Sequence, residues 1–189
     1  MLRRTCRATG LTLTLDEDPE PRNPRLAEEP LFHFVTWTTP RLGDAHGWPS
    51  ARRFASEMRR VPALVLPVRI LWSSDGRPGF CVVALEDDQA AGHAFATHDR
   101  LRLHYGTDDL TPALIEEAQL VCDTELLAYE EYLGGDVHAF TIAAPDGRVL
   151  ERRAGLFGLE WAEHTAERAF EDHVVRWRRD GERSRRPAA

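Results

Sequence analysis

The regular spacing of apolar residues after Thr111 predicts the clearest helix in the chain. Thr111 can cap this helix, and proline at position 112 suits its first turn. Apolar residues then recur at steps of three and four, which places them on one helical face: Ile115, Ala118, Cys122, Leu126, Tyr129 and Leu133. Gly134-Gly135 ends the pattern. We therefore expect a helix over 111–133.

Residues 137–143 and 147–152 predict an antiparallel hairpin. They flank a Pro-Asp-Gly sequence that is typical of a tight turn, with Gly147 in the left-handed conformation. A link punctuated by glycines then leads to a final helix over 159–178. Its apolar face consists of Leu159, Ala162, Ala166, Ala169, Phe170, Val174 and Trp177. Helix, hairpin and second helix form one block over 111–178.

Shorter patterns in the first half of the chain predict strands. Residues 11–15 alternate strictly, so three leucines lie on one face of a short strand. Apolar stretches rich in β-branched and aromatic residues predict further strands at 31–37, 63–72 and 79–85. Pro67 has no backbone donor, so the strand over 63–72 should lie at a sheet edge or carry a bulge.

The same part of the chain predicts two helices and a loop. Ser50 can cap an amphipathic helix over 51–60. Thr97 begins a short helical stretch that Gly106 can end in the left-handed conformation. Residues 16–30 contain four prolines and many acidic side chains, so we expect a loop there.

These elements predict an α+β fold. A chain of 189 residues is long enough for one ordinary core and short for two. We expect a single domain over 11–178, in which an antiparallel sheet of about five to seven strands carries three to four helices. Residues 1–10 should form a flexible basic N-terminus, and residues 179–189 a disordered tail of Arg, Pro and Ala.

Composition excludes several classes of chemistry. The chain has no lysine, and its 24 basic residues are all arginine. Schiff-base enzymes and the lysine of a P-loop are therefore excluded. There is no GxSxG motif for a serine nucleophile and no glycine-rich nucleotide motif, so we expect no cofactor.

The cysteines and the hydropathy indicate a cytoplasmic protein. Cys6, Cys81 and Cys122 lack CxxC spacing, so they predict neither a disulfide framework nor a zinc site. Cys81 and Cys122 fall within apolar patterns, and we expect both thiols to be buried and inert. No apolar stretch reaches the length that spans a bilayer, which indicates no association with a membrane.

The charge is divided between an acidic body and basic ends. The net charge of −7 comprises +3 on the first seven residues, +4 on residues 176–189 and therefore −14 on residues 8–175. An acidic body suits a partner protein with a basic surface. The alternative is that the charge only keeps the protein soluble.

The final helix offers a candidate binding surface. Glu160, Glu163, Glu167 and Glu171 lie on one side of it, away from the apolar face. Asp136, at the start of the hairpin, adds a fifth carboxylate to the same block. We expect these five residues to contact a partner, and the alternative is a solvated acidic stripe.

Histidines and one aspartate offer a weaker candidate for metal binding or catalysis. Asp44 and His46 occupy a glycine-containing turn, where they could act as ligand or general base, although turn chemistry also accounts for Asp44. His93, His98 and His104 are close in sequence but lack the i,i+4 spacing of a helical zinc site. Together they define the alternative function of a metal-dependent hydrolase or nucleic-acid-processing enzyme.

The C-terminal arginines could contact nucleic acid. Six of them surround Trp177: Arg176, Arg178, Arg179, Arg183, Arg185 and Arg186. Such contact would be weak, indifferent to sequence and strongly dependent on salt. The alternative is a solvated chain end.

The second half of the chain resembles a known group of proteins. The resemblance is carried by Tyr129-Glu-Glu-Tyr132-Leu-Gly-Gly-Asp136-Val137-His-Ala-Phe140, then Asp146-Gly147 with Val149-Leu150, and by Gly155-Leu-Phe-Gly158-Leu-Glu-Trp161. In these stretches the chain is similar to a family of small uncharacterised proteins from actinobacterial phages and mobile elements. Weaker similarity extends to Arg22-Asn23-Pro24, to residues 42–46 and to Tyr105-Gly106.

The resemblance implies a setting rather than an activity. This chain departs from the family pattern at His138-Ala139 and at Arg152-Arg153-Ala154. Accessory proteins of mobile DNA often block host defence or host copying machinery. The leading hypothesis is therefore a non-enzymatic accessory protein whose acidic surface binds a macromolecular partner, for example by imitating the charge of nucleic acid.

Overall fold

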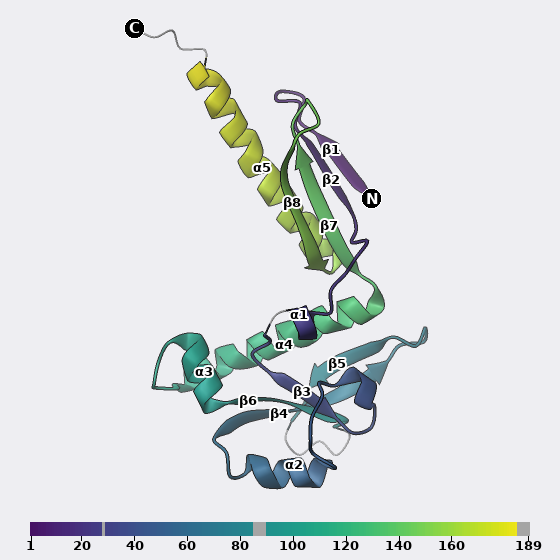
Figure 1. Ribbon diagram of the computed structural model, residues 1–189, viewed down its shortest axis with the longest axis vertical. Coiled ribbons are helices and arrows are strands. Elements are labelled where there is room, and N and C mark those ends of the chain that lie inside the picture. The colour runs from purple at the N-terminus through teal and green to yellow at the C-terminus, as the bar shows by residue number, and fades with distance from the viewer. Residues whose placement is uncertain (28, 85–89, 185–189) are drawn as a thin grey trace. The chain divides into compact units, whose positions relative to one another are not determined.

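The computed structural model describes residues 1–27, 29–84 and 90–184, which contain two antiparallel sheets of four strands each (Figure 1). The α+β class is confirmed. The predicted single sheet of five to seven strands is wrong, since eight strands form two separate sheets and five α-helices accompany them in the described residues. Where the sequence predicts one domain, the chain divides into two compact units. We call residues 1–22 with 135–189 the terminal unit and residues 23–134 the central unit.

The terminal unit consists of one sheet and one helix. Its strands are β1 (Leu2–Thr5), β2 (Thr12–Glu17), β7 (Val137–Ala143) and β8 (Val149–Phe157), in the spatial order β1-β2-β7-β8. Helix α5 (Leu159–Ser184) packs on one face. The alternating leucines at 11, 13 and 15 are buried there with Phe140 and Ile142 from β7 and with Ala166 and Phe170 from α5.

The ends of the terminal unit differ from the prediction. Residues 2–5 lie in the segment predicted as flexible, yet they form β1 because they pair with residues 12–15 of β2. Helix α5 continues to Ser184, six residues past the predicted end. Residues 185–189 of the predicted disordered tail lie outside the described residues.

The central unit holds the second sheet. Its strands are β3 (His33–Thr36), β4 (Ala63–Trp72), β5 (Pro78–Val82) and β6 (Gly92–Thr97), in the spatial order β3-β6-β4-β5. Its helical segments are α1 (Pro24–Ala27), the short 3-10 turn η1 (Pro40–Leu42), α2 (Ala51–Met58), α3 (His98–Tyr105) and α4 (Pro112–Gly134). The short helix α1 was expected to be loop. Strand β6 has no counterpart in the prediction.

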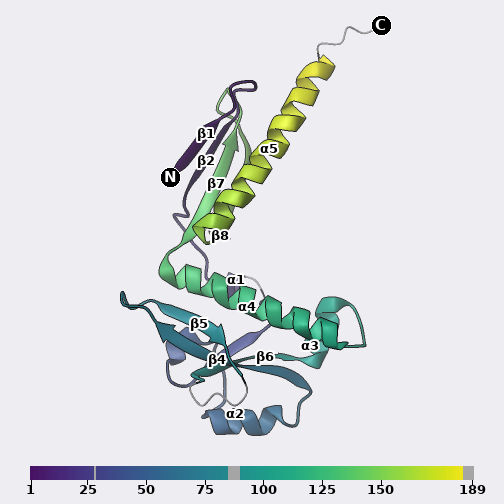
Figure 2. The ribbon, with the colours of Figure 1, turned by 180° about the vertical axis from the view of Figure 1, so that it is seen from behind.

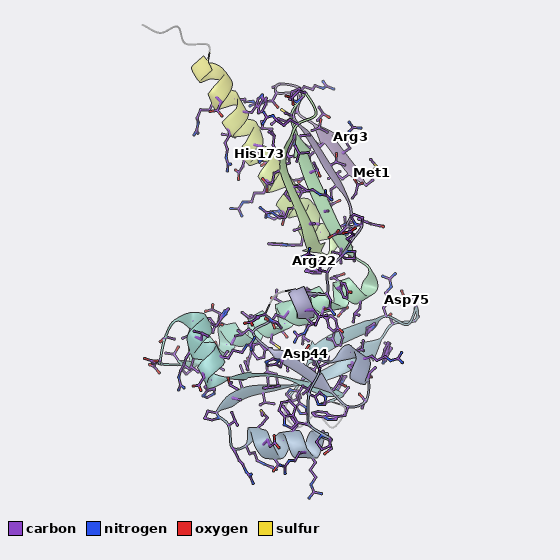
Figure 3. All side chains as sticks on the ribbon, in the orientation of Figure 1. Met1, Arg3, Arg22, Asp44, Asp75 and His173 are labelled. Carbon is purple, nitrogen blue, oxygen red and sulfur yellow. The ribbon has the colours of Figure 1, made fainter. Side chains whose placement is uncertain are left out.

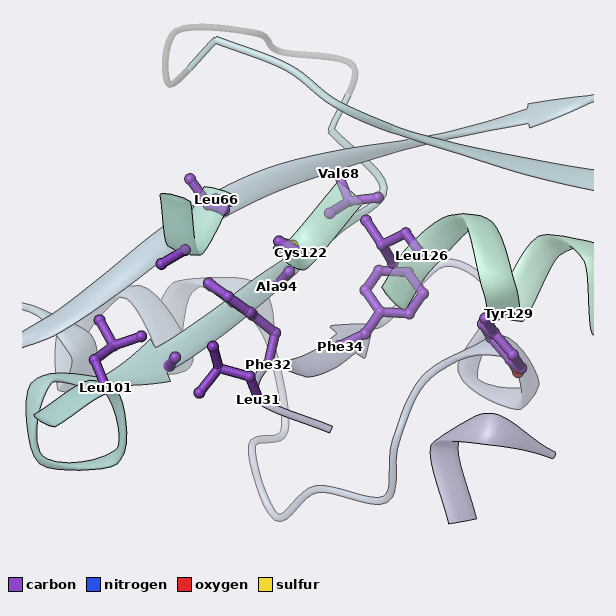
Figure 4. Close-up of a cluster of buried hydrophobic side chains, with 12 residues drawn as sticks. Leu31, Phe32, Phe34, Leu66, Val68, Ala94, Leu101, Cys122, Leu126 and Tyr129 are labelled. Atoms are coloured by element: carbon purple, nitrogen blue, oxygen red, sulfur yellow. The ribbon is translucent and has the colours of Figure 1, made fainter. Parts of the chain in front are cut away.

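Helices cover both faces of this sheet (Figures 1 and 2). On the α4 face, Phe34, Leu66 and Val68 pack with Cys122 and Leu126 of α4, and Figure 4 shows these side chains together. On the α2 face, a smaller cluster joins Val35, Phe54 and Phe95. The sheet is therefore buried from both sides, as a central layer.

Pro67 lies inside the sheet and not at an edge. Strand β4 lies between β6 and β5, so the prediction of an edge or a bulge is wrong. The carbonyl of Pro67 accepts a hydrogen bond from the N–H of Val83, just past the end of β5 (2.9 Å). The missing N–H of proline faces that same side, where the ladder of β4 with β5 ends, and so it interrupts little pairing.

Most of the predicted caps are confirmed. The side chain of Ser50 accepts from the N–H of Arg53, and Gly106 ends α3 in the left-handed conformation at φ +63°. The helix, hairpin and helix over 111–178 are also present, but they do not form one block. Helix α4 belongs to the central unit, whereas the hairpin and α5 belong to the terminal unit. None of the described helices combines the length and the apolar character that crossing a bilayer requires.

Candidate functional site

A buried ion pair lies at the centre of the charged groups of the central unit. Arg25, in α1, has a side chain that is only 4% exposed. Its Nε and Nη2 donate to the two carboxylate oxygens of Asp44 at 3.0 and 2.6 Å, which makes the contact bidentate. Nη2 also donates to the carbonyl of Phe32 at 2.7 Å. Figure 3 labels Asp44 within this unit.

Glu125 of α4 joins the same cluster. Its carboxylate accepts from the N–H groups of Leu31 and Phe32 and lies 3.7 Å from Nη1 of Arg25. Burial raises the pKa of Glu125, although the backbone N–H groups and Arg25 act in the opposite direction. Glu125 thus links α4 to the segment that enters β3.

These three charged side chains hold the backbone of residues 31–34. Asp44 accepts from the N–H of Phe34 at 2.8 Å, and its own N–H donates to the carbonyl of Phe34 at 2.7 Å. The contacts of Arg25, Asp44 and Glu125 are thus directed at one another and at the segment that leads into β3. This arrangement is typical of a structural clamp and leaves Asp44 poorly placed to act as a general base.

The histidines proposed as metal ligands are distributed over different elements. His46 and His93 both contact Trp37, with ring centroids 5.2 and 6.1 Å away. They belong to an aromatic cluster on the α2 face that also contains Trp48, Phe54 and Phe95. Within the described residues, Nδ1 of each histidine is buried without a hydrogen-bond partner. Burial lowers the pKa of His93.

Asp44, His98 and His104 do not join this pair. Asp44 is held by Arg25, His98 is the first residue of α3, and His104 is exposed near the end of α3. In the described ranges, no three side chains of His, Cys, Asp or Glu gather closely enough to hold a metal ion. The sequence neighbours His93 and His98 separate because a strand ends and a helix begins between them.

The thiols differ from one another in burial. Cys122 is buried in the core as predicted, and burial raises its pKa to about 12. The prediction for Cys81 is wrong, because this residue is exposed on β5. Its strand has an apolar pattern, but residues 79 and 81 occupy the face opposite to Phe80 and Val82, which pack toward α4.

The acidic stripe predicted on α5 is present at the surface. Glu160, Glu167 and Glu171 are exposed and Glu163 is half-buried. One positive charge lies beside them, because Nη1 of Arg4 in β1 is 3.5 Å from Oε1 of Glu167. The Arg4 guanidinium also lies 5.8 Å from the ring centroid of Phe170. The stripe is therefore partly compensated within its own unit.

Asp136 serves the local structure of the hairpin. Its side chain contacts Nε2 of His138 and accepts from the N–H of Leu159 at 3.4 Å, at the start of α5. Its carbonyl accepts from the N–H of Gly158 at 2.9 Å. These bonds join the beginning of β7 to the beginning of α5, so Asp136 stabilises the local structure of the hairpin.

The central unit has an acidic surface that sequence reasoning missed. The central unit contains 17 acidic residues and 10 arginines and carries the whole net charge of −7, whereas the terminal unit is neutral. Helix α4 alone has six carboxylates and no basic residue. Its exposed carboxylates are Glu116, Glu117 and Asp123, which we call the α4 acidic face. A count of charge along this helix alone would have found it.

Arg176 and Arg178 lie on the final helix as predicted, while Arg179 and Arg183 lie on its continuation, in place of the predicted disordered tail. Arg176, Arg178 and Arg179 are exposed on α5, while Trp177 packs against the core of the terminal unit. Nearby, His173 of α5 contacts Oε2 of Glu151 in β8 at 2.8 Å (Figure 3). Arg185 and Arg186 lie outside the described residues.

Comparison of the chain with protein-family models, with curated proteins and with solved structures gave no match. The resemblance to proteins of phages and mobile elements therefore rests on the sequence motifs quoted above.

Proposed function

We propose that this protein is a non-enzymatic accessory protein that binds a basic macromolecular partner through the acidic surface of its central unit. The observation that carries the proposal is the concentration of the net charge of −7 in residues 23–134, with six carboxylates and no basic residue on α4. Clustered charge of one sign raises the rate of encounter with an oppositely charged surface.

The resemblance to proteins of phages and mobile elements supports a role against host defence. In that role the α4 acidic face imitates the charge of nucleic acid toward a DNA- or RNA-binding host protein. Duplex DNA should then compete with the acidic protein for the host protein. Release by DNA of proteins captured from a host lysate is the expected result, and capture that is insensitive to DNA would contradict the mimicry.

A labelled deca-arginine peptide tests the underlying charge recognition. We expect it to bind the full chain with an affinity that falls steeply as salt rises. Replacing Glu116 and Glu117 with Gln and Asp123 with Asn should weaken binding at least about fivefold at low salt, because one contact between unit charges in water is worth about 1 kcal/mol.

The matched control changes the same number of charges on the other helix. The variant Glu160→Gln, Glu163→Gln, Glu171→Gln should weaken binding clearly less, since it lies in the neutral unit. Fluorescence anisotropy measures both variants. Equal affinities for the wild type and the α4 variant would remove the α4 acidic face from the proposal, and failure of the wild type to bind the peptide would overturn it.

A further inference from the structure

One end of the terminal unit is built from three segments that lie far apart in the sequence (Figures 1 and 2). The turn between β1 and β2 meets the turn between β7 and β8, since a Cβ built on Gly10 would lie 2.8 Å from Cγ of Pro145. The second half of α5 reaches the same end, where Trp177, like Cys6 and Leu150, packs against the apolar core of the unit. The fold therefore brings together residues 6–11, 144–149 and 173–180.

These three segments, which we call the basic end, carry five exposed arginines. They are Arg7 on the first turn, Arg148 on the second, and Arg176, Arg178 and Arg179 on α5. The acidic residues of the same segments are Asp146 and Asp180, so the basic end has a net charge of +3. The terminal unit as a whole is neutral, and its positive charge is therefore concentrated at one end.

The thiol of Cys6 shows that an arginine of α5 lies at the first turn. The pKa of Cys6 is lowered to about 7, chiefly by a hydrogen bond with the side chain of Thr9 and also by one with Arg178. The guanidinium of Arg178 thus stabilises negative charge at the turn that carries Arg7. The two arginines act on the same place although 171 positions separate them in the sequence.

We propose that the basic end binds the phosphate backbone of duplex DNA. A guanidinium presents its N–H groups as a planar fork that fits the oxygens of a phosphate. Arginines on three segments can contact several phosphates at once without reading the bases, so binding is indifferent to sequence. The inference goes beyond the proposed function, because it concerns the other unit and a partner of opposite charge.

An anionic membrane fits the basic end less well than DNA does. Binding to a membrane surface requires apolar side chains that enter the lipid. Among the described residues of the basic end, the large apolar side chains that are exposed are Val149 and Val175, and both are small for this purpose. The arginines of the two turns also extend the run of arginines near the C-terminus into a surface, which suits a long polyanion.

Fluorescence anisotropy of a labelled short DNA duplex tests the inference on the full chain. We expect binding at low salt, with a slope of about −4 in a plot of log affinity against log salt, because each neutralised phosphate contributes about −0.9. Arg7→Gln with Arg148→Gln should weaken binding at least about fivefold, which corresponds to about 1 kcal/mol. The same change should make the slope shallower by about two.

Two matched controls remove the same charge elsewhere. Arg52→Gln with Arg59→Gln changes exposed arginines of the central unit and should alter binding less than about twofold. Arg185→Gln with Arg186→Gln changes the chain end. If the variant of the two turns binds as tightly as the wild type while the chain-end variant loses binding, the terminal run alone carries the contact and the basic end is excluded. Thermal unfolding checks that each variant is folded.

Alkylation of the thiols by iodoacetamide locates the bound duplex. DNA at low salt should slow the modification of Cys6 at the basic end and leave that of Cys81, which is exposed on β5 of the central unit, unchanged. Mass spectrometry of the two peptides measures both rates. A rate at Cys6 that DNA does not alter would place the duplex elsewhere and overturn the inference.

Vesicles that contain phosphatidylserine provide the remaining comparison. Binding to these vesicles without binding to the duplex would assign the basic end to a membrane and overturn the inference. Failure to bind either probe would also overturn it. Both results leave the proposed function standing, because that function depends on the binding of deca-arginine by the central unit.

Discussion

The guanidinium of Arg25 is held by both carboxylate oxygens of Asp44, at 3.0 Å from Nε and 2.6 Å from Nη2. The pair joins two distant stretches of sequence. Asn23 precedes α1 and accepts from the N–H of Arg25 at 2.9 Å, while Asp44 follows η1.

Removing one partner of this pair should destabilise the protein strongly. Arg25→Met leaves Asp44 and Glu125 without their buried cation, and the loss of one member of a buried pair typically costs about 3–5 kcal/mol. Urea unfolding measures the free energy of unfolding. Arg41→Met, at an exposed arginine, is the control and should change it by less than about 0.5 kcal/mol.

A double-mutant cycle distinguishes the clamp from a functional role. If Arg25→Met together with Asp44→Asn costs much less than the sum of the single changes, the two side chains act through each other. Additive effects would contradict the coupling that the bidentate contact implies.

Local patterns predicted most elements of the fold but not their assembly. The capped helices at 51–60 and 111–133 and the hairpin after Val137 depend on residues close in sequence, and each is present. The division into two sheets depends on pairing such as Leu13 with Ile142, across more than a hundred residues, which periodicity does not contain. The cluster of Arg25, Asp44 and Glu125 was missed for the same reason, because its members are far apart in sequence.

Strand β6 escaped prediction because of its small residues. Gly-His-Ala-Phe-Ala-Thr has neither strict alternation nor β-branched residues in its centre. It lies between β3 and β4 and is covered on both faces, so small residues are needed where the chain is most crowded. A strand that is buried on both faces does not show the alternation of apolar and polar residues that is expected where one face of the sheet is solvated.

Gly92 tests that explanation. A Cβ built on Gly92 would lie 2.4 Å from the carbonyl oxygen of Val35 in the neighbouring strand. Gly92→Ala should therefore cost about 3 kcal/mol of unfolding free energy, as overpacking of a core does. Gly47→Ala is the matched control, because nothing lies within 4 Å of a Cβ there. Equal stability of both variants in chemical denaturation would show that β6 tolerates the methyl group.

His93 should make the stability depend on pH. Burial lowers its pKa from the ordinary value of 6.5, so the unfolded chain takes up a proton more readily than the folded chain. The contribution of neutral His93 is complete above pH 6.5 and is lost as the pH falls through and below that value. The pKa of His33 is lowered by burial and by Arg100, so His33 also makes the stability decrease toward acid pH.

The free energy of unfolding at pH 7.5, 6.5 and 5.5 measures this effect. His93→Gln should make the free energy of unfolding decrease less toward acid pH, because glutamine stays neutral. His104→Gln changes an exposed histidine and should leave the decrease as it is in the wild type. A decrease unaltered by His93→Gln would assign the pH dependence to other groups.

Arg4 provides a test of the second acidic surface, the stripe on α5. Its guanidinium lies 3.5 Å from Glu167, and the two side chains are 49% and 51% exposed, so the pair itself should contribute less than about 1 kcal/mol to stability. Its larger effect is electrostatic, since it is a cation beside Glu167, one of the four carboxylates of the stripe. If Glu160, Glu163, Glu167 and Glu171 bind a basic partner, Arg4→Gln should strengthen binding of deca-arginine at low salt, and replacement of the four glutamates by glutamine should weaken it.

The control is Arg3→Gln, which lies on the opposite face of β1 and removes an equal charge from the same unit. An equal gain for both variants would mean that only net charge matters, whereas a gain confined to Arg4→Gln would establish α5 as a binding surface in its own right.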